Sequence, residues 1–179
     1  MTEAAAFAAW LGAAMIVLSD GRRGLALGLA LTTVAFTVLA WVDGERLAAA
    51  ALLVGGGVAA ARRFRTGPDV WGAMPAGSTP RLVLSIAGGL LALWISTSVM
   101  TGPGAGLRFA ALSVLGLMAA RVVTEAENAA ILTALAALAL SVAMVASLSE
   151  TSPGPAPYIA AGLIALGVSV VRIRETSGT

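Results

Sequence analysis

The chain has 179 residues, of which 59% are hydrophobic and only 11% are charged, and its formal net charge is +2. A soluble domain carries about a quarter charged residues, so this composition excludes an ordinary soluble domain and predicts an integral membrane protein. The absence of cysteine and histidine excludes thiol chemistry, disulfides, iron–sulfur ligation, imidazole general base catalysis and the usual zinc ligand sets.

Seven apolar segments follow one another along the chain, separated by charged or Gly/Pro-rich sequence: residues 4–18, 24–42, 47–61, 82–100, 107–123, 129–148 and 158–171. Runs of about 18 or more apolar residues span a bilayer core about 30 Å thick as helices. The first, third and seventh segments are short for a span and require flanking residues or local thinning of the bilayer. Because the runs are apolar on every face, they lack the alternation of a membrane β-barrel. We therefore predict an all-α, polytopic membrane helical bundle with about seven spans.

The first segment is preceded by the acidic residue Glu3 and by no basic residue. It therefore lacks the basic region of a secretory signal peptide, and we expect it to remain as a membrane span. All seven prolines lie at or outside the ends of the segments. The missing N–H of proline costs little there, so the segments are expected to form unbroken helices.

The distribution of arginine, the only basic residue type, predicts the orientation in the membrane, because short cytoplasmic loops are enriched in Lys and Arg. With the N-terminus outside, the outer loops hold Arg46 and Arg108, and the inner loops hold nine arginines: Arg22, Arg23, Arg62, Arg63, Arg65, Arg81, Arg121, Arg172 and Arg174. This asymmetry predicts an outer N-terminus and an inner C-terminus, which agrees with an odd number of spans. The exclusive use of arginine and the abundance of alanine indicate a GC-rich bacterial genome, and hence the bacterial cytoplasmic (inner) membrane.

Three of these arginines, Arg62, Arg63 and Arg65, stand together at the end of the third segment. We interpret them as a topology anchor that contacts anionic lipids of the inner leaflet. Docking of a cytoplasmic partner is the alternative. Nucleic acid is not an expected partner, because no aromatic-interleaved basic stripe or nucleic-acid motif accompanies the cluster.

A helical hairpin plan recurs after the first segment. The ranges 24–65, 82–123 and 129–174 each contain a long helix, an outer turn and a shorter helix that closes on an arginine, namely Arg62, Arg121 or Arg172. We therefore predict a single integral membrane domain over residues 1–179, with an N-terminal span in residues 1–20 and three hairpin repeats. Shared hydropathy alone is the alternative explanation of this similarity.

Two of the hairpins carry a family resemblance. The sequences VMTGPGAGLRFAALSVLGLMAA and SETSPGPAPYIAAGLIALGVSVV, together with the three-hairpin plan over residues 24–174, resemble the HdeD-like (DUF308, acid-resistance membrane protein) group of small membrane proteins. The resemblance implies a compact bundle of hairpins whose molecular activity is poorly defined. The additional N-terminal span departs from the six-helix plan of that group.

The predicted segments contain no acidic residue, lysine or histidine. Ion-driven transporters commonly keep such groups within the bilayer, so a carboxylate proton relay is not expected. No carboxylate pair, Ser/Lys pair, metal-ligand set or phosphate-binding loop occurs at catalytic spacing. We therefore expect neither enzyme activity nor a cofactor or metal site.

Arg121 is the charged residue that fits least easily into a membrane segment. Only twelve residues separate it from Arg108, which corresponds to about 18 Å of helix, so at least one of the two arginines is expected to snorkel. Glu125 follows Arg121 at the i,i+4 spacing that favours an ion pair. We interpret Arg121 as a snorkelling anchor that tolerates leucine. The alternative is a site for an ion, a lipid headgroup or a partner subunit formed by Arg121, Glu125 and Glu127.

Small residues within the segments favour close packing of helices, notably at Gly24 and Gly28, at 55–57 and at 88–89. With short loops and no acid inside the segments, they predict a non-catalytic protein, either an accessory subunit of a membrane assembly or a self-associating HdeD-like protein. The alternative is a transporter or channel for a small neutral or lipid-like molecule. The expected partners are the bilayer, anionic lipids at its inner face, and other membrane subunits or further copies of the chain.

Overall fold

The structure is a computed structural model that describes residues 2–66, 104–125, 127–149 and 154–171, together with the isolated positions 79, 83, 86, 87 and 90. These ranges contain six helices and no strand: α1 (Thr2–Leu18), α2 (Arg22–Val42), α3 (Arg46–Arg65), α5 (Ala105–Thr124), α6 (Asn128–Ser149) and α7 (Ala156–Val170). The predicted helical class is confirmed for this part of the chain. Most of the predicted span 82–100 lies outside the described residues, as do Arg81, Arg172 and Arg174.

Four of the described helices, α2, α3, α5 and α6, are long and apolar enough to cross a membrane, whereas α1 and α7 are shorter apolar helices of 17 and 15 residues. Flanking residues lengthen the short third segment, since α3 runs for 20 residues. The three arginines at its end remain helical, and positive side chains are favourable near a helix C-terminus. These helices indicate a membrane protein, and the count of seven spans stays a prediction.

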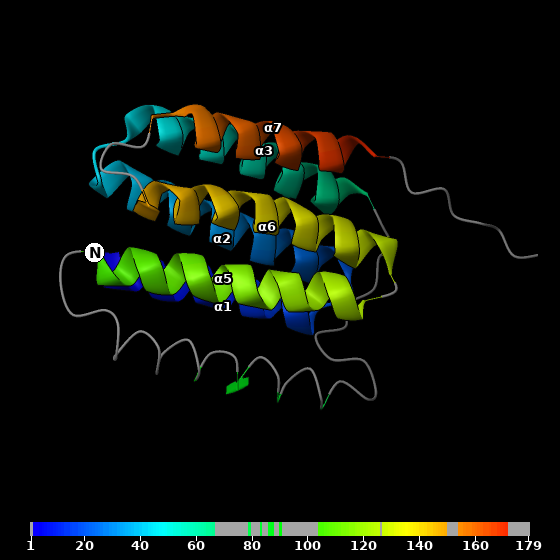
Figure 1. Ribbon diagram of the computed structural model, residues 1–179. Coiled ribbons are helices and arrows are strands. Elements are labelled where there is room, and N and C mark those ends of the chain that lie inside the picture. The colour runs from blue at the N-terminus through cyan, green and yellow to red at the C-terminus, as the bar shows by residue number, and fades with distance from the viewer. Residues whose placement is uncertain are drawn as a thin grey trace, which may run out of the picture.

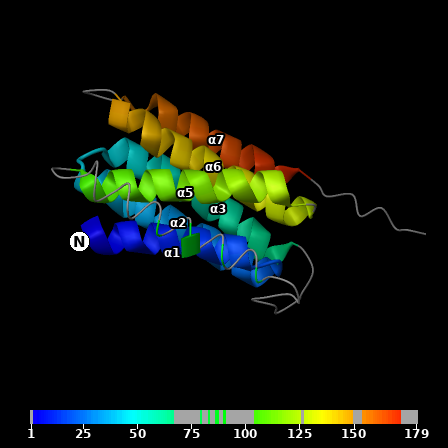
Figure 2. The same cartoon turned by 60° about the horizontal axis from the view of Figure 1, so that its bottom comes forward.

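The six described helices form two layers (Figures 1 and 2). One layer consists of α1, α2 and α3 and the other of α5, α6 and α7, with α1 packed against α5, α2 against α6, and α3 against α7. Each of the paired helices runs in the same direction as its counterpart (Figure 1). Segments about a hundred residues apart in the chain therefore end side by side at the same end of the bundle.

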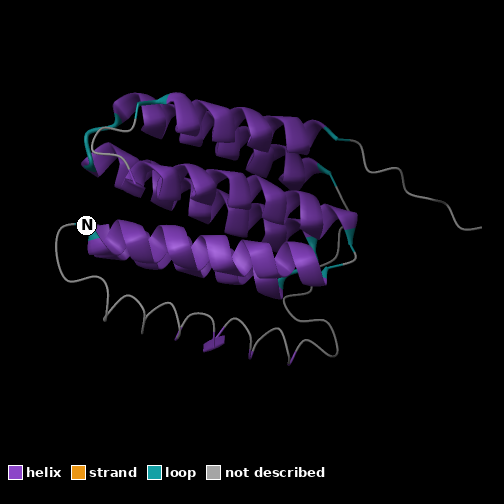
Figure 3. Ribbon diagram, in the orientation of Figure 1, coloured by secondary structure: helices purple, strands orange, loops and turns teal. Residues whose placement is uncertain are grey.

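Short turns connect α1 to α2 and α2 to α3 (Figure 3). Between α2 and α3 the chain turns at Gly44, whose φ is 88°. This left-handed conformation favours glycine and ends the helix, and the N–H of Glu45 then donates to the carbonyl oxygen of Ala40 at 3.0 Å. The predicted hairpin 24–65 corresponds to the packed pair α2 and α3, and 129–174 includes the packed pair α6 and α7. Whether the three predicted hairpins are structural copies stays a prediction.

Small residues bring the helices into close contact. A Cβ atom added to Gly12 of α1 would lie 2.8 Å from the carbonyl oxygen of Gly28 on α2, and one added to Gly55 of α3 would overlap the Cα atom of Gly162 on α7. Helices that cross this closely require glycine at the contact. The surrounding core is rich in fully buried alanines, including Ala9, Ala13, Ala48, Ala110, Ala111, Ala130, Ala134, Ala137 and Ala165.

The larger apolar side chains of the bundle often point outward. Among those with high exposure are Phe7, Leu27, Trp41, Val54, Leu112, Ile159 and Leu163. In water, contiguous exposed apolar surface of this kind would be an aggregation liability. In hydrocarbon it needs no cover, so these outward apolar residues suit a bilayer, while the core holds larger side chains such as Phe36 and Leu140 among its alanines.

Candidate functional site: an ion-pair cluster at one end of the bundle

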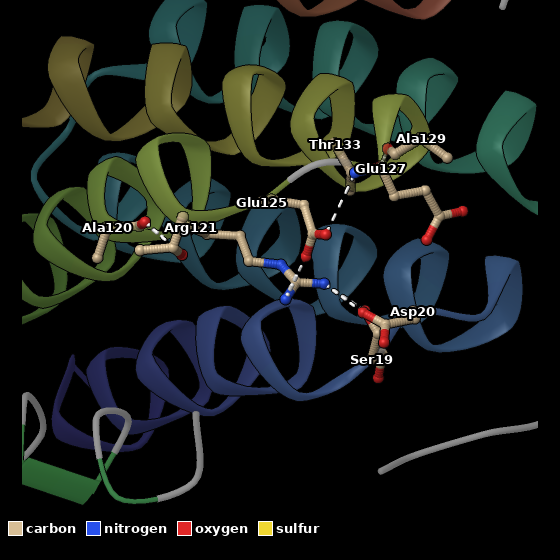
Figure 4. Close-up of polar contacts among 9 residues, drawn as sticks. Ser19, Asp20, Ala120, Arg121, Glu125, Glu127, Ala129 and Thr133 are labelled. Atoms are coloured by element: carbon tan, nitrogen blue, oxygen red, sulfur yellow. Dashed lines mark hydrogen bonds and ion pairs between the residues drawn. The ribbon is translucent and has the colours of Figure 1, made fainter. Parts of the chain in front are cut away.

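The C-terminal ends of α1 and α5 meet at the end of the bundle where most of the described arginines lie. After α1 ends at Leu18, Ser19 and Asp20 lead into α2, and Arg121 lies in the last turn of α5. Because α1 packs against α5, the turn after α1 reaches the side chain of Arg121. We call Asp20, Arg121, Glu125 and Glu127 the ion-pair cluster (Figure 4).

Arg121 forms the centre of this cluster, with its guanidinium between Glu125 and Asp20 (Figure 4). Its Nη2 lies 2.6 Å from Oδ1 of Asp20 and also donates to the carbonyl oxygen of Ser19 at 3.1 Å. Its Nη1 lies 2.7 Å from Oε2 of Glu125. The side chain of Arg121 is 2% exposed, against 29% for Asp20 and 7% for Glu125. One buried cation is therefore held by two carboxylates and one carbonyl.

Glu127 belongs to the loop between α5 and α6 and completes the cluster. Its backbone N–H donates to Oε1 of Glu125 at 3.2 Å. The carboxylate of Glu125 therefore binds both the guanidinium of Arg121 and the backbone of Glu127. Burial raises the pKa of the Glu127 carboxyl above its ordinary value, and the charges of Asp20 and Glu125 act in the same direction. Arg121 and Arg63 oppose these effects without cancelling them. The negative charge on Glu127 is thus disfavoured in the folded chain.

The three arginines at the end of α3 do not act as one group. Arg62 and Arg65 are exposed, whereas Arg63 turns inward and is 8% exposed. Arg63 and the polar residues Thr66, Thr133 and Ser169 line a cavity of about 10 Å³, the size of one water molecule. Its positive charge also acts on Glu127. Arg63 is therefore an electrostatic neighbour of the ion-pair cluster, while the other two arginines remain at the surface.

The structure brings together Arg121, Glu125 and Glu127, the residues of the predicted alternative site. The ion pair between Arg121 and Glu125, predicted from their spacing, is confirmed. The side chain of Arg121 is 2% exposed and lies where α5 packs against α1, and its expected snorkelling toward the membrane surface stays a prediction. A second acid, Asp20, compensates its charge there and makes burial tolerable.

Sequence reasoning missed Asp20 and the carbonyl of Ser19. The alternation of loops places both on the same side of the membrane as Arg121, and this was the signal available. It did not show that α1 and α5 are neighbours, because that contact joins residues 101 positions apart. The pairing of the two layers decides which of the several loops on that side meet.

The arrangement is suited to bracing the bundle. It connects the α1–α2 turn to the α5–α6 loop through one guanidinium, and so joins the two layers. The guanidinium of Arg121 is paired with a carboxylate on each side, Asp20 and Glu125. Within the described ranges, no group of three or more His, Cys, Asp or Glu side chains is placed to hold a metal ion.

Comparison with known proteins adds no assignment to this cluster. No family model, curated protein or solved structure matches the chain. The resemblance to the HdeD-like group therefore stays a prediction, and the contacts of the described residues are the basis for a functional proposal.

Proposed function

We propose that this chain is a non-catalytic multi-pass membrane protein that works through association of helices, either as an accessory subunit of a membrane complex or as a self-associating protein of the HdeD-like kind. The ion-pair cluster is the observation that carries the proposal. Its central cation is 2% exposed and has a carboxylate on each side. A catalytic or transport site would need at least one such group directed at a substrate, whereas these groups are engaged with one another.

The packing between the helices supports the same proposal over a transporter. A path through the described part of the bundle would need space where helices instead meet backbone to backbone, as at Gly12 with Gly28 and at Gly55 with Gly162. The residues between the layers include many fully buried alanines, which leave little freedom to open a channel without separating the layers. The outward apolar side chains, by contrast, offer surface to other helices within the membrane.

We further propose that the arginine-rich end faces the cytoplasm of a bacterial inner membrane. The described arginines at the start of α2 and at the ends of α3 and α5 share this end, and only Arg46 and Arg108, at the starts of α3 and α5, lie at the other. A cytoplasm-active reporter fused after Thr179 should be active, and a periplasm-active reporter should be silent. The opposite result would reverse the proposed orientation.

The test of assembly is cross-linking in intact membranes, followed by purification of the full chain in mild detergent and native mass spectrometry. We expect either a discrete oligomer or a fixed stoichiometry with another membrane protein, present before solubilisation. A control helical membrane protein expressed at the same level should not form these adducts. A chain that is monomeric in both measurements and has no membrane partner would contradict the proposal.

A further inference from the structure

An apolar groove runs along the outer side of the bundle between α2 and α3, away from the contact between the layers. Its volume is about 290 Å³. The residues that line it come equally from the two helices: Ala26, Leu27, Ala30, Thr33 and Val34 of α2, and Leu53, Gly57, Ala60, Ala61 and Phe64 of α3. We call it the α2–α3 groove. None of the ion-pair cluster residues lines it.

The groove has large rims and a small-residue floor. Leu27, Val34, Leu53 and Phe64 are each about half exposed and form the rims, whereas Ala26 and Ala60 are buried. A Cβ atom built on Gly57 would meet nothing within 4 Å, so the space above this glycine is open. Thr33 is the polar residue in the lining, and its hydroxyl already donates to the carbonyl oxygen of Leu29 at 2.7 Å. The groove therefore presents an apolar surface.

One end of the groove lies among arginines. Arg23 precedes Ala26 by three residues and Arg65 follows Ala61 by four, so both arginines continue the helix faces that line the groove. The helical rise from Arg23 to Val34, and from Leu53 to Arg65, is about 16–18 Å. Half of a bilayer core is about 15 Å. The groove thus extends from the arginines through roughly one leaflet.

We propose that the α2–α3 groove binds one anionic phospholipid, with an acyl chain along the small-residue floor and the phosphate at Arg23 and Arg65. The apolar lining matches the chain, and the arginines match the phosphate, to which a guanidinium can donate two parallel hydrogen bonds. A helix from a second copy could use the same small residues. An apolar helix would not compensate the positive charges at the mouth of the groove, whereas a lipid phosphate would, so the charge complementarity favours the lipid.

This inference requires that the chain lie in a membrane, and it does not depend on the proposed assembly. The full chain would be purified, stripped of lipid with detergent, and supplied with phosphatidylglycerol or with phosphatidylcholine that has the same acyl chains. Native mass spectrometry then counts the retained lipid. We expect one phosphatidylglycerol per chain and little phosphatidylcholine. Equal retention of the two lipids would overturn the proposal.

Two variants locate the lipid within the groove. Gly57→Leu fills the open space and should lower retained phosphatidylglycerol to the phosphatidylcholine level. Leucine is the better helix former, so the variant should keep its helical circular dichroism. Gly167→Leu on α7 is the matched control, because a Cβ atom there also meets nothing within 4 Å. It should bind lipid as the parent chain does. Unchanged retention in Gly57→Leu would overturn the site.

Charge variants test the mouth of the groove without altering its packing. Arg65→Gln removes an exposed charge and should weaken phosphatidylglycerol binding about fivefold, the effect expected for one arginine near an anionic lipid. Arg46→Gln, at the opposite end of the bundle, should leave binding unchanged. Equal effects of the two variants would contradict a local phosphate site. If Gly57→Leu instead converts a dimer to a monomer with lipid retention intact, the occupant is a second copy and the lipid proposal fails.

Discussion

The two ends of the bundle treat charge in opposite ways. At the arginine-rich end, Arg121 is 2% exposed and pairs with Asp20 from the other layer. At the opposite end, Asp43 and Arg46 are exposed beside the α2–α3 turn, and the guanidinium carbon of Arg46 lies 5.8 Å from the ring centre of Trp41 on the preceding helix. The Arg121 pair joins elements that are distant in the sequence, whereas the contact of Arg46 with Trp41 lies within one local turn.

The difference predicts where substitutions matter. Taking charges out of water is unfavourable, so removal of one member of a buried pair leaves an uncompensated partner and is strongly destabilising. An exposed charge keeps its hydration whether or not it has a partner, and its removal changes little. Variants at the two ends should therefore differ in effect even where the chemical change is similar.

The largest effect is expected for Arg121→Leu. This change leaves Asp20 and Glu125 facing each other without their shared cation, and we expect a loss of about 3 kcal/mol or more in the free energy of unfolding. Unfolding in mixed micelles with increasing dodecyl sulfate would measure it. The triple variant Asp20→Asn, Arg121→Leu, Glu125→Gln should recover part of the loss. If Arg121→Leu is as stable as the parent chain, the simple anchor interpretation of Arg121 is correct.

A smaller effect is expected for Asp20→Asn, because Glu125 still compensates Arg121. Asp20 is 29% exposed, and the loss of its charged hydrogen bond should therefore cost about 1 kcal/mol, below the range for fully buried partners. A double-mutant cycle of Asp20→Asn with Arg121→Leu would isolate the coupling between the two residues. A coupling energy near zero would show that the bridge between the layers contributes nothing to stability.

Glu127 should make the stability depend on pH. Its pKa is raised in the folded chain, mainly by burial, so between its ordinary pKa and the raised value the folded state binds more protons than the unfolded state. Stability should therefore fall as the pH rises through this window. Glu127→Gln should match the parent chain below the window and exceed its stability above it by less than about 1 kcal/mol. Thermal unfolding at several pH values would measure this, and a parent chain that gains stability across the window would contradict it.

The smallest effects are expected at the opposite end. The pKa of Asp43 is raised first by partial loss of hydration near the protein and next by the charge of Glu45. The residue is nevertheless exposed to its surroundings. Asp43→Asn and Arg46→Gln should each change the free energy of unfolding by less than about 0.5 kcal/mol, as is usual for surface substitutions. The same unfolding titration used for Arg121→Leu gives a direct comparison. Losses as large as that of Arg121→Leu would remove the distinction between the two ends.

Sequence patterns predicted the described helices well, because each depends on a local run of apolar residues. The observed bounds of α2 and α6 lie within two residues of the predicted segments. Only the segment predicted for α3, residues 47–61, was clearly shorter than the helix. Its terminal arginines were assigned to a loop, and in the structure they are helical. The i,i+4 spacing across the end of α5 also predicted the contact of Arg121 with Glu125. These features need no knowledge of which helices are neighbours.

The parts that could not be predicted all depend on tertiary packing. Asp20 reaches Arg121 only because α1 lies against α5, and Arg63 turns inward while Arg62 and Arg65 do not. Three consecutive glycines, at 55–57, looked equivalent in the sequence. In the structure Gly55 contacts Gly162, Gly56 contacts Thr33, and Gly57 opens onto the groove. An apolar sequence of this kind carries little information about which face of a helix meets which neighbour.

The bridge between Asp20 and Arg121 has a consequence for the order of assembly during synthesis. The two residues are 101 positions apart, so at translation rates of about 5–20 residues per second the α1–α2 turn exists for about 5–20 s before Arg121 is made. During that interval Asp20 must be accommodated by water and by its own turn, which keeps that end of the first three helices at the aqueous edge of the membrane. The bridge can form only after α5 has been inserted, and it therefore marks a late step, at which the second layer docks onto the first.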